Sequence, residues 1–184
     1  MTEEELVRRL QAGDAAAFET LYERYQNLIV RTAALITGSR QEGEDLAQEC
    51  FIRCWQQIKT LRDPARLKSW MLTILTRDAW RAGKRRQRET PVEEFWEGEP
   101  GPSSLDAVLR QESDRRLYQA IRALPDKQRA IVILYYFDDL PVREIARVTG
   151  SLEGTVKSRL FNARRALRAA LGEDFMTEME VYSV

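Results

Sequence analysis

Apolar side chains recur every three or four residues along most of this chain, which is the spacing of one buried face of an α-helix. The run AIVILYYF, from Ala130 to Phe137, is the one stretch that also resembles a strand. Because helical patterns flank this run on both sides, we expect it to fill a core as a helix. The pattern therefore predicts an all-α protein.

Residues that favour helix ends stand at the borders of these patterns. Thr2 and Ser39 are each followed three residues later by glutamate, which is the spacing of a capping box. Asp14 and Asp63 stand at further N-cap positions, and Gly38 suits the end of the second helix. We therefore expect a small helical bundle with one shared core in the first 89 residues.

The helical pattern is interrupted after residue 89. The stretch from Thr90 to Ser104 carries three prolines, two glycines and four glutamates without any period, which is typical of a linker. Helical spacing resumes at Leu117. We therefore expect two small helical domains, residues 1–89 and residues 115–171, joined by an acidic flexible linker at 90–114 and followed by an acidic tail at 172–184.

The 29 basic and 29 acidic residues balance, but they are segregated along the chain. Residues 1–90 hold 16 basic and 13 acidic residues, and residues 115–171 hold 12 and 5, so both expected domains are basic. Residues 91–114 hold 1 basic and 7 acidic residues, and the tail holds 0 and 4. This pattern indicates that each domain meets a polyanion, although charges that merely solvate helix surfaces would produce it as well.

Several classes of function find no support in the residues. The chain has no histidine, which removes the commonest general base and metal ligand. Cys50 and Cys54, four residues apart on an apolar face, favour core packing over half of a zinc site. Gly83-Lys84 lacks both the first glycine and the Ser/Thr of a phosphate-binding loop. We therefore expect no catalytic residue, no bound metal and no cofactor.

The location of the chain follows from its start and its apolar runs. The first residues, MTEEELVRRL, are charged and lack the apolar stretch of a signal peptide. No apolar run approaches the roughly 18 residues that a membrane span needs. The sequence predicts a cytoplasmic protein without membrane insertion.

The strongest local pattern lies in residues 142–165. Ala146 stands four residues before Gly150, and Val156 stands six after it, which is the spacing of a helix-turn-helix motif. Ser151 can cap the second helix. A helical hairpin with solvated basic side chains is the alternative to DNA binding. The outer face of the second helix would offer the following residues to a major groove: Glu153, Gly154, Thr155, Lys157, Ser158, Arg159, Phe161, Asn162 and Arg165.

Two further surfaces stand out in the first domain. Behind Pro64, a stripe of basic and aromatic residues suits unpaired bases, although an amphipathic helix with a basic end explains it too. This stripe comprises Arg66, Thr73, Arg77, Trp80 and Lys84. The polar side of the helix from Ser39 suits a protein partner, with a solvated face as the alternative. Its residues are Asp45, Gln48, Glu49, Ile52 and Gln56.

Four segments together resemble the bacterial extracytoplasmic-function (ECF) sigma factors of the sigma-70 family. They are EDLAQECFIRCW (44–55), RLKSWMLTILTRD (66–78), LPDKQRAIVILYYFDDLPVREIA (124–146) and GTVKSRLFNARRAL (154–167). Their order and spacing agree with that family over nearly the whole chain. The resemblance implies a protein that binds core RNA polymerase and directs it to promoters. It also implies an anti-sigma factor as a further partner, through which the protein would be tethered indirectly to a membrane.

The resemblance also implies roles for residues. The face of Asp45, Gln48, Glu49, Ile52 and Gln56 would bind core polymerase. The helix from Ser151 to Arg168 would read the −35 element as duplex, and the acidic linker would thread toward the RNA-exit path. The −10 element and a flipped base of its melted strand would be held by Arg62, Asp63, Arg66, Lys68, Thr73, Arg77, Asp78, Trp80, Lys84 and Arg85.

Two residues depart from the family pattern. Asp78 stands where the family usually has asparagine, and a carboxylate there would repel phosphate and donate no hydrogen bond. Asn162 stands where arginine is frequent, and since asparagine prefers adenine edges, we expect an altered −35 preference. The tail from Glu173 matches nothing that we can assign.

Sequence reasoning leaves two other classes of protein open. A DNA-binding repressor or activator would share the helix-turn-helix without needing the face around Asp45 or the basic-aromatic stripe. An enzyme acting on nucleic acid would need a metal-binding cluster of carboxylates, and no local pattern in the sequence indicates one.

Overall fold

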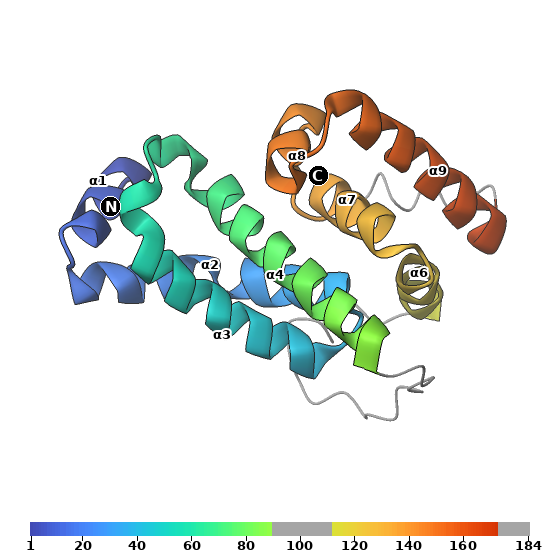
Figure 1. Ribbon diagram of the computed structural model, residues 1–184, viewed down its shortest axis with the longest axis horizontal. Coiled ribbons are helices and arrows are strands. Elements are labelled where there is room, and N and C mark those ends of the chain that lie inside the picture. The colour runs from blue at the N-terminus through green and yellow to red at the C-terminus, as the bar shows by residue number, and fades with distance from the viewer. Residues whose placement is uncertain (90–111, 173–184) are drawn as a thin grey trace.

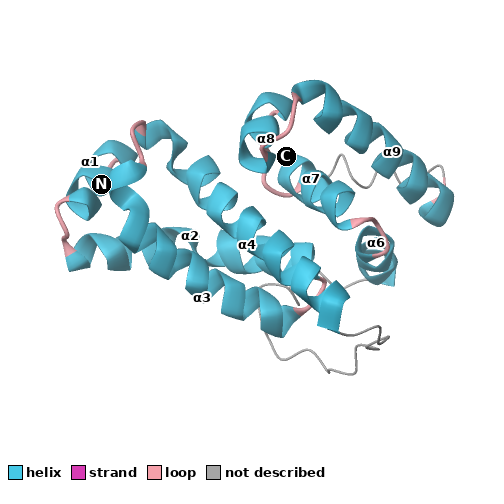
Figure 2. Cartoon of the chain, viewed as in Figure 1, coloured by secondary structure: helices cyan, strands magenta, loops and turns pink. Residues whose placement is uncertain are grey.

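The computed structural model describes residues 1–89 and 112–172, and every regular element among these residues is helical (Figures 1 and 2). The N-terminal part comprises α1 (Glu3–Gln11), α2 (Ala15–Thr37), α3 (Arg40–Gln57), two 3₁₀ turns, η1 (Ile58–Thr60) and η2 (Pro64–Arg66), and α4 (Leu67–Glu89). The C-terminal part comprises α6 (Glu112–Arg122), α7 (Asp126–Tyr136), α8 (Val142–Thr149) and α9 (Glu153–Leu171). The all-α prediction is confirmed. The predicted linker falls almost entirely outside the described residues, and so does the acidic tail beyond Gly172.

The predicted helix starts are confirmed by their hydrogen bonds. The Thr2 hydroxyl accepts from the Glu5 N–H at 3.2 Å, and the Ser39 hydroxyl accepts from the Glu42 N–H at 3.4 Å. Asp14 caps α2 by accepting from the Ala16 N–H at 3.0 Å. The Asp63 carboxylate caps the short turn η2 instead of a full α-helix, and α4 begins only at Leu67. These side chains satisfy N–H groups that a helix start leaves unpaired.

The close contact of α2 with α3 depends on Gly43. A Cβ atom built on Gly43 would lie 2.5 Å from both the Cα and the N of Ala34. Only a residue without a side chain permits this approach, because the neighbouring atoms belong to the backbone of α2 and cannot rotate away. Gly38, with φ 72°, ends α2 and allows the chain to turn straight into α3.

Buried apolar side chains from α1 to α4 form the core of the N-terminal part. Leu21 and Ile29 of α2 pack with Met71 and Leu75 of α4, all of them fully buried. Cys50 and Cys54 are also completely buried and carry free thiols. The prediction that these cysteines pack in the core is confirmed.

The C-terminal part is built around α7, the apolar run that also resembled a strand. Ile131, Ile133 and Leu134 are fully buried, because α6, α8 and α9 pack around this helix and α2 of the N-terminal part covers it further. Between α8 and α9 the chain turns through Gly150, whose φ is 60°. Val156 of α9 is buried, as a helix-turn-helix corner requires.

The expected capping of α9 by Ser151 is wrong. The helix starts at Glu153, and Leu152 occupies the N-cap position without a side-chain hydrogen bond. The Ser151 N–H still bonds to the Ala146 carbonyl, so this residue belongs to the turn that closes α8. Its hydroxyl instead accepts from an Arg159 Nη at 3.1 Å.

The two parts lie side by side along α2 and α4 (Figure 1). Helix α4 packs against α8, and α2 packs against α7. The buried apolar side chains of both parts form one continuous cluster. No helix in residues 1–89 and 112–172 has the length and apolar character needed to cross a bilayer.

Candidate nucleic-acid and protein interfaces

Helix α9 presents the predicted base-reading face outward. Val156, Leu160, Ala163 and Leu167 are buried and anchor one side of the helix against α7 and α8. The opposite side carries the predicted groove-facing residues, of which only Thr155 and Arg159 are half-buried. Phe161 is apolar and yet 63% exposed on this side. The helix is therefore fixed from behind while its polar face is free for a ligand.

The basic side chains of α9 divide into two groups. Lys157 and Arg165 are exposed on the outer face. Arg164 serves the fold, because its Nε donates to the Tyr136 hydroxyl at 2.7 Å and its guanidinium lies 5.4 Å from the centre of the Tyr135 ring. A sequence pattern that counts cations cannot separate these groups.

The predicted protein-binding face of α3 is a single exposed surface. All five of its residues are exposed, and Ile52 is 56% accessible to solvent although it is apolar. Tyr22 of α2 and Trp55 extend this surface with partly exposed aromatic rings. Sequence reasoning missed Tyr22, because it lies on another helix. Its ring reaches α3 by packing against Phe51, with 4.9 Å between the two ring centres.

The predicted strand-binding residues lie around α4 at different depths. Arg62, Asp63, Arg66, Arg77, Lys84 and Arg85 are exposed, and Lys68, Thr73 and Trp80 are half-buried. The Thr73 hydroxyl donates to the Ser69 carbonyl at 2.8 Å, and Trp80 packs against the core. Asp78 is only 6% exposed, so it lies much deeper than the sequence suggested.

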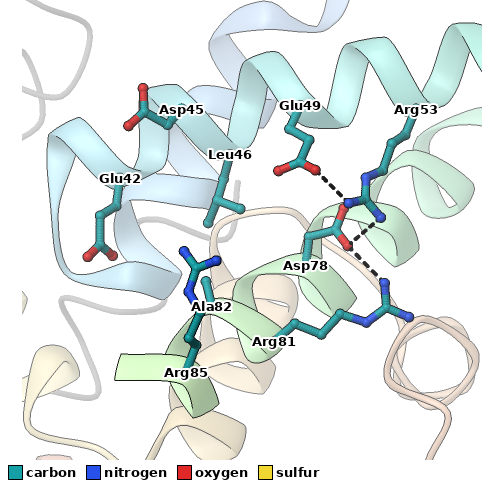
Figure 3. Close-up of a pocket in the computed structure, with 9 residues that line it drawn as sticks. All are labelled: Glu42, Asp45, Leu46, Glu49, Arg53, Asp78, Arg81, Ala82 and Arg85. Atoms are coloured by element: carbon teal, nitrogen blue, oxygen red, sulfur yellow. Dashed lines mark hydrogen bonds and ion pairs between the residues drawn. The ribbon is translucent and has the colours of Figure 1, made fainter. Parts of the chain in front are cut away.

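A pocket between α3 and α4 holds Asp78 (Figure 3). Asp78 Oδ1 lies 3.1 Å from an Arg53 Nη and 3.4 Å from an Arg81 Nη, so the carboxylate bridges the two helices. Its Oδ2 is buried and has no hydrogen-bond partner among the described residues. The remaining lining residues are Glu42, Asp45, Leu46, Glu49, Ala82 and Arg85.

The charges around this pocket explain why Asp78 does not resemble a DNA ligand. Burial raises the pKa of the Asp78 carboxyl, and the Arg53 guanidinium offsets only part of that effect. The carboxylate lies between Arg53 of α3 and Arg81 of α4 and is joined to both (Figure 3). Within the described ranges, no cluster of acidic and cysteine side chains could hold a metal ion.

We expect Asp78→Asn to leave the free energy of unfolding within about 1 kcal/mol of the parent chain. A raised carboxyl pKa means that the charge costs the folded state stability above that pKa, so a neutral isostere removes a cost together with the ion pairs. Urea denaturation at pH 7.5 measures the difference. Asp14→Asn is the matched control and should lower stability, because the Arg9 guanidinium lowers the pKa of Asp14 and its charge therefore stabilises the fold. A loss of more than 2 kcal/mol from Asp78→Asn would show that the ion pairs dominate.

Family comparisons place two known patterns on these helices. The sequence model for "Sigma-70 region 2" matches residues 21–89, and the model for "Sigma-70, region 4" matches residues 114–167. The first range contains α3 and α4, and the second contains the helix-turn-helix.

Whole-chain comparisons agree with these models. The chain is 32% identical to RNA polymerase sigma-H factor of Pseudomonas aeruginosa, over 92% of this chain and 93% of the relative. It is 31% identical to ECF RNA polymerase sigma factor SigL of Mycobacterium tuberculosis, over 88% and 93%. Among solved structures, the sigma factor RpoE in complex with the anti-sigma factor NepR from Bartonella quintana aligns with a TM-score of 0.70 at 23% identity, covering 85% of this chain and 98% of that one. CnrH in complex with the cytosolic domain of CnrY aligns with a TM-score of 0.68 at 21% identity, covering 94% and 98%.

Proposed function

The chain belongs to the ECF sigma factors of the sigma-70 family, and we propose that its three exposed faces divide the work of promoter-directed initiation among them. Members of this family are transcription initiation factors that act with RNA polymerase rather than enzymes. The observation that carries the proposal is the helix-turn-helix itself, whose second helix is anchored by four buried side chains while its outer face is open.

We assign the α3 face to core RNA polymerase. Acidic and amide side chains surround the exposed Ile52, and Tyr22 and Trp55 add aromatic area beside it. An apolar centre with a polar rim is the usual composition of a protein–protein interface. Residues 1–89 would accordingly form the domain that binds polymerase and the −10 element.

The −10 strand would lie along α4 and the preceding turns. Arg62, Arg66, Arg77 and Lys84 are exposed there, so they can neutralise phosphates. Trp80 packs against the core and offers only part of its ring to a base. Asp78 takes no direct part, because it is buried between α3 and α4.

The −35 duplex would be read by α9 in the domain of residues 115–171. The N-terminal end of a recognition helix supplies base contacts, and neighbouring cations supply phosphate contacts. Lys157 and Arg165 fit the second role, and Asn162 fits contact with adenine.

We expect Lys157→Ala to weaken binding to a −35 duplex with little change in sequence preference. Since Lys157 is exposed on the outer face of α9, its loss should remove one phosphate contact and flatten the log–log salt dependence by about 1. Fluorescence anisotropy at several salt concentrations measures this slope. Lys59→Ala is the matched control, because Lys59 is also exposed but lies in the other domain. An equal loss of affinity at every salt concentration would contradict the phosphate role.

An anti-sigma factor would regulate this chain. Both of the solved structures named above are described as complexes, one with NepR and one with the cytosolic domain of CnrY. The exposed faces of α3 and α9 are the surfaces that such a partner would have to cover in order to block polymerase and DNA.

Reconstitution with core RNA polymerase tests the proposal. Adding the purified chain to core enzyme and a library of promoter fragments should yield transcripts from fragments that share one −35 and one −10 sequence. Duplex binding without any transcript would favour a repressor, and cleavage or modification of the DNA by the chain alone would favour an enzyme.

A further inference from the structure

The two domains meet at a buried carboxylate. Asp138, in the turn between α7 and α8, is 1% exposed and points into the N-terminal domain. The Thr32 hydroxyl of α2 lies 2.9 Å from its Oδ1 and 3.1 Å from its Oδ2, and an Arg31 Nη lies 3.2 Å from Oδ1. The side chain of Asp138 is thus held by the other domain.

The backbone of the same turn is held as well. The Arg31 guanidinium donates to the Phe137 carbonyl at 2.6 Å, and the Lys68 ammonium of α4 donates to the Asp138 carbonyl at 2.6 Å. All these donors come from the N-terminal domain, and all the acceptors come from two consecutive residues of the C-terminal domain. Such charge-assisted bonds are stronger than neutral ones.

Close contacts at two glycines extend the interface from this turn to the opposite end of α7. A Cβ atom on Gly38 would lie 3.2 Å from Arg122 Cγ of α6, and one on Gly83 would lie 3.2 Å from Asp126 Oδ2 of α7. Helix α4 also packs along α8. The domains therefore touch along their length, with Asp138 at a polar site inside an apolar contact.

We propose that this docked arrangement is a closed, autoinhibited state of the free protein, in which the turn at Asp138 acts as a latch on α2 and α4. Inhibition of DNA binding by this state rests on the function proposed above, whereas the docking of the two domains does not. Lys68 is one of the residues expected to hold the −10 strand, but in this state its ammonium group is bound to the Asp138 carbonyl.

Promoter geometry requires the latch to open. Elements named −10 and −35 are about 25 base pairs apart, which is roughly 85 Å of B-form DNA. In the docked state α9 packs on α8 and α8 packs on α4, so their axes are separated by only about 20 Å. The 22 residues of 90–111 have a fully extended length of roughly 75 Å, enough for the domains to move far apart.

The closed state leaves other surfaces available. The α3 face and the outer face of α9 both remain exposed, so polymerase or a −35 duplex can bind the closed protein before the domains separate. Binding that requires separated domains would then draw the equilibrium toward the open state, since a ligand stabilises the conformation it prefers.

The test uses Asp138→Lys in the full chain, with Asp139→Lys as its matched control. Both variants change the charge equally, but Asp139 is exposed and lies outside the hydrogen bonds of the latch. Thr32→Val is a second test variant, because it removes a hydroxyl donor from α2 without altering the C-terminal domain. Spin labels at Lys59→Cys and Ala169→Cys report the separation of the domains, and the native cysteines are buried.

We expect a single short distance in the parent chain and in Asp139→Lys, and a broad longer distribution in Asp138→Lys. Thr32→Val should raise the open fraction about tenfold, as expected for a buried charge that loses a hydrogen-bond donor. Asp138→Lys should also bind single-stranded −10 DNA at least about threefold more tightly than Asp139→Lys. A long distance in the parent chain would overturn docking. Equal strand binding by the open variant and its control would overturn autoinhibition, and failure of all variants to support transcription would instead refute the proposed function.

Discussion

Gly43→Ala is expected to lower the free energy of unfolding by about 3 kcal/mol, the upper end of the usual cost of overpacking. The added methyl group would lie 2.5 Å from two backbone atoms of Ala34, so α2 and α3 must move apart to admit it. Because α3 also carries the proposed polymerase-binding face, this displacement should reach that surface. Urea denaturation followed by circular dichroism measures the loss as a lower midpoint at constant slope.

Gly154→Ala is the control for this substitution. Gly154 lies in the first turn of α9, and a Cβ atom there would meet nothing within 4 Å. Alanine favours helix over glycine by roughly 1 kcal/mol in an open helical position, so this variant should be as stable as the parent chain or more so. A loss of less than 1 kcal/mol in Gly43→Ala would mean that the two helices separate easily.

The helices were predictable because their signals are local. Each cap, such as Thr2 or Ser39, acts on an N–H group within three residues, and apolar spacing identifies the buried face of a helix without knowledge of its neighbour. The importance of Gly43 was not predictable, because nothing in a helix sequence says how closely another helix approaches. Ser151 was misassigned because the turn closing α8 continues one residue further than its glycine suggests.

Candidate site residues were predictable where they share one helix and not where they depend on contacts between helices. Helical periodicity correctly grouped the five exposed residues of α3, because one helix carries all of them. The depth of Asp78 was not predictable, since its ion pair with Arg53 joins positions 25 residues apart on different helices. The role of Asp138 was not predictable either, because its partners Arg31 and Thr32 lie more than 100 residues away.

Docking of the two domains is expected to strengthen about tenfold when the pH falls from 7.5 to 5.0. Burial raises the pKa of Asp138 to about 6 in the docked state, against the opposing effects of Arg31 from α2 and Lys68 from α4. In the open state the carboxyl would be exposed, with an ordinary pKa near 3.8. Docking therefore takes up a proton, so the added stability is complete below pH 4 and is lost as the pH rises through 6. Arginine and lysine keep their charge throughout this range, and the chain has no histidine to titrate in it.

The open fraction of Thr32→Val, followed with the spin-label pair, measures this dependence, because both populations should be sizeable in that variant. Asp138→Asn provides the contrast, since its neutral amide imitates the protonated carboxyl. It should stay docked at pH 7.5 and show no pH response between 5.0 and 7.5. A response that survives in Asp138→Asn would place the titrating group elsewhere, with Asp78 the first candidate because burial raises its pKa too. An unchanged open fraction of Thr32→Val at both pH values would show that Asp138 keeps an ordinary pKa and that the domain contact does not desolvate its charge.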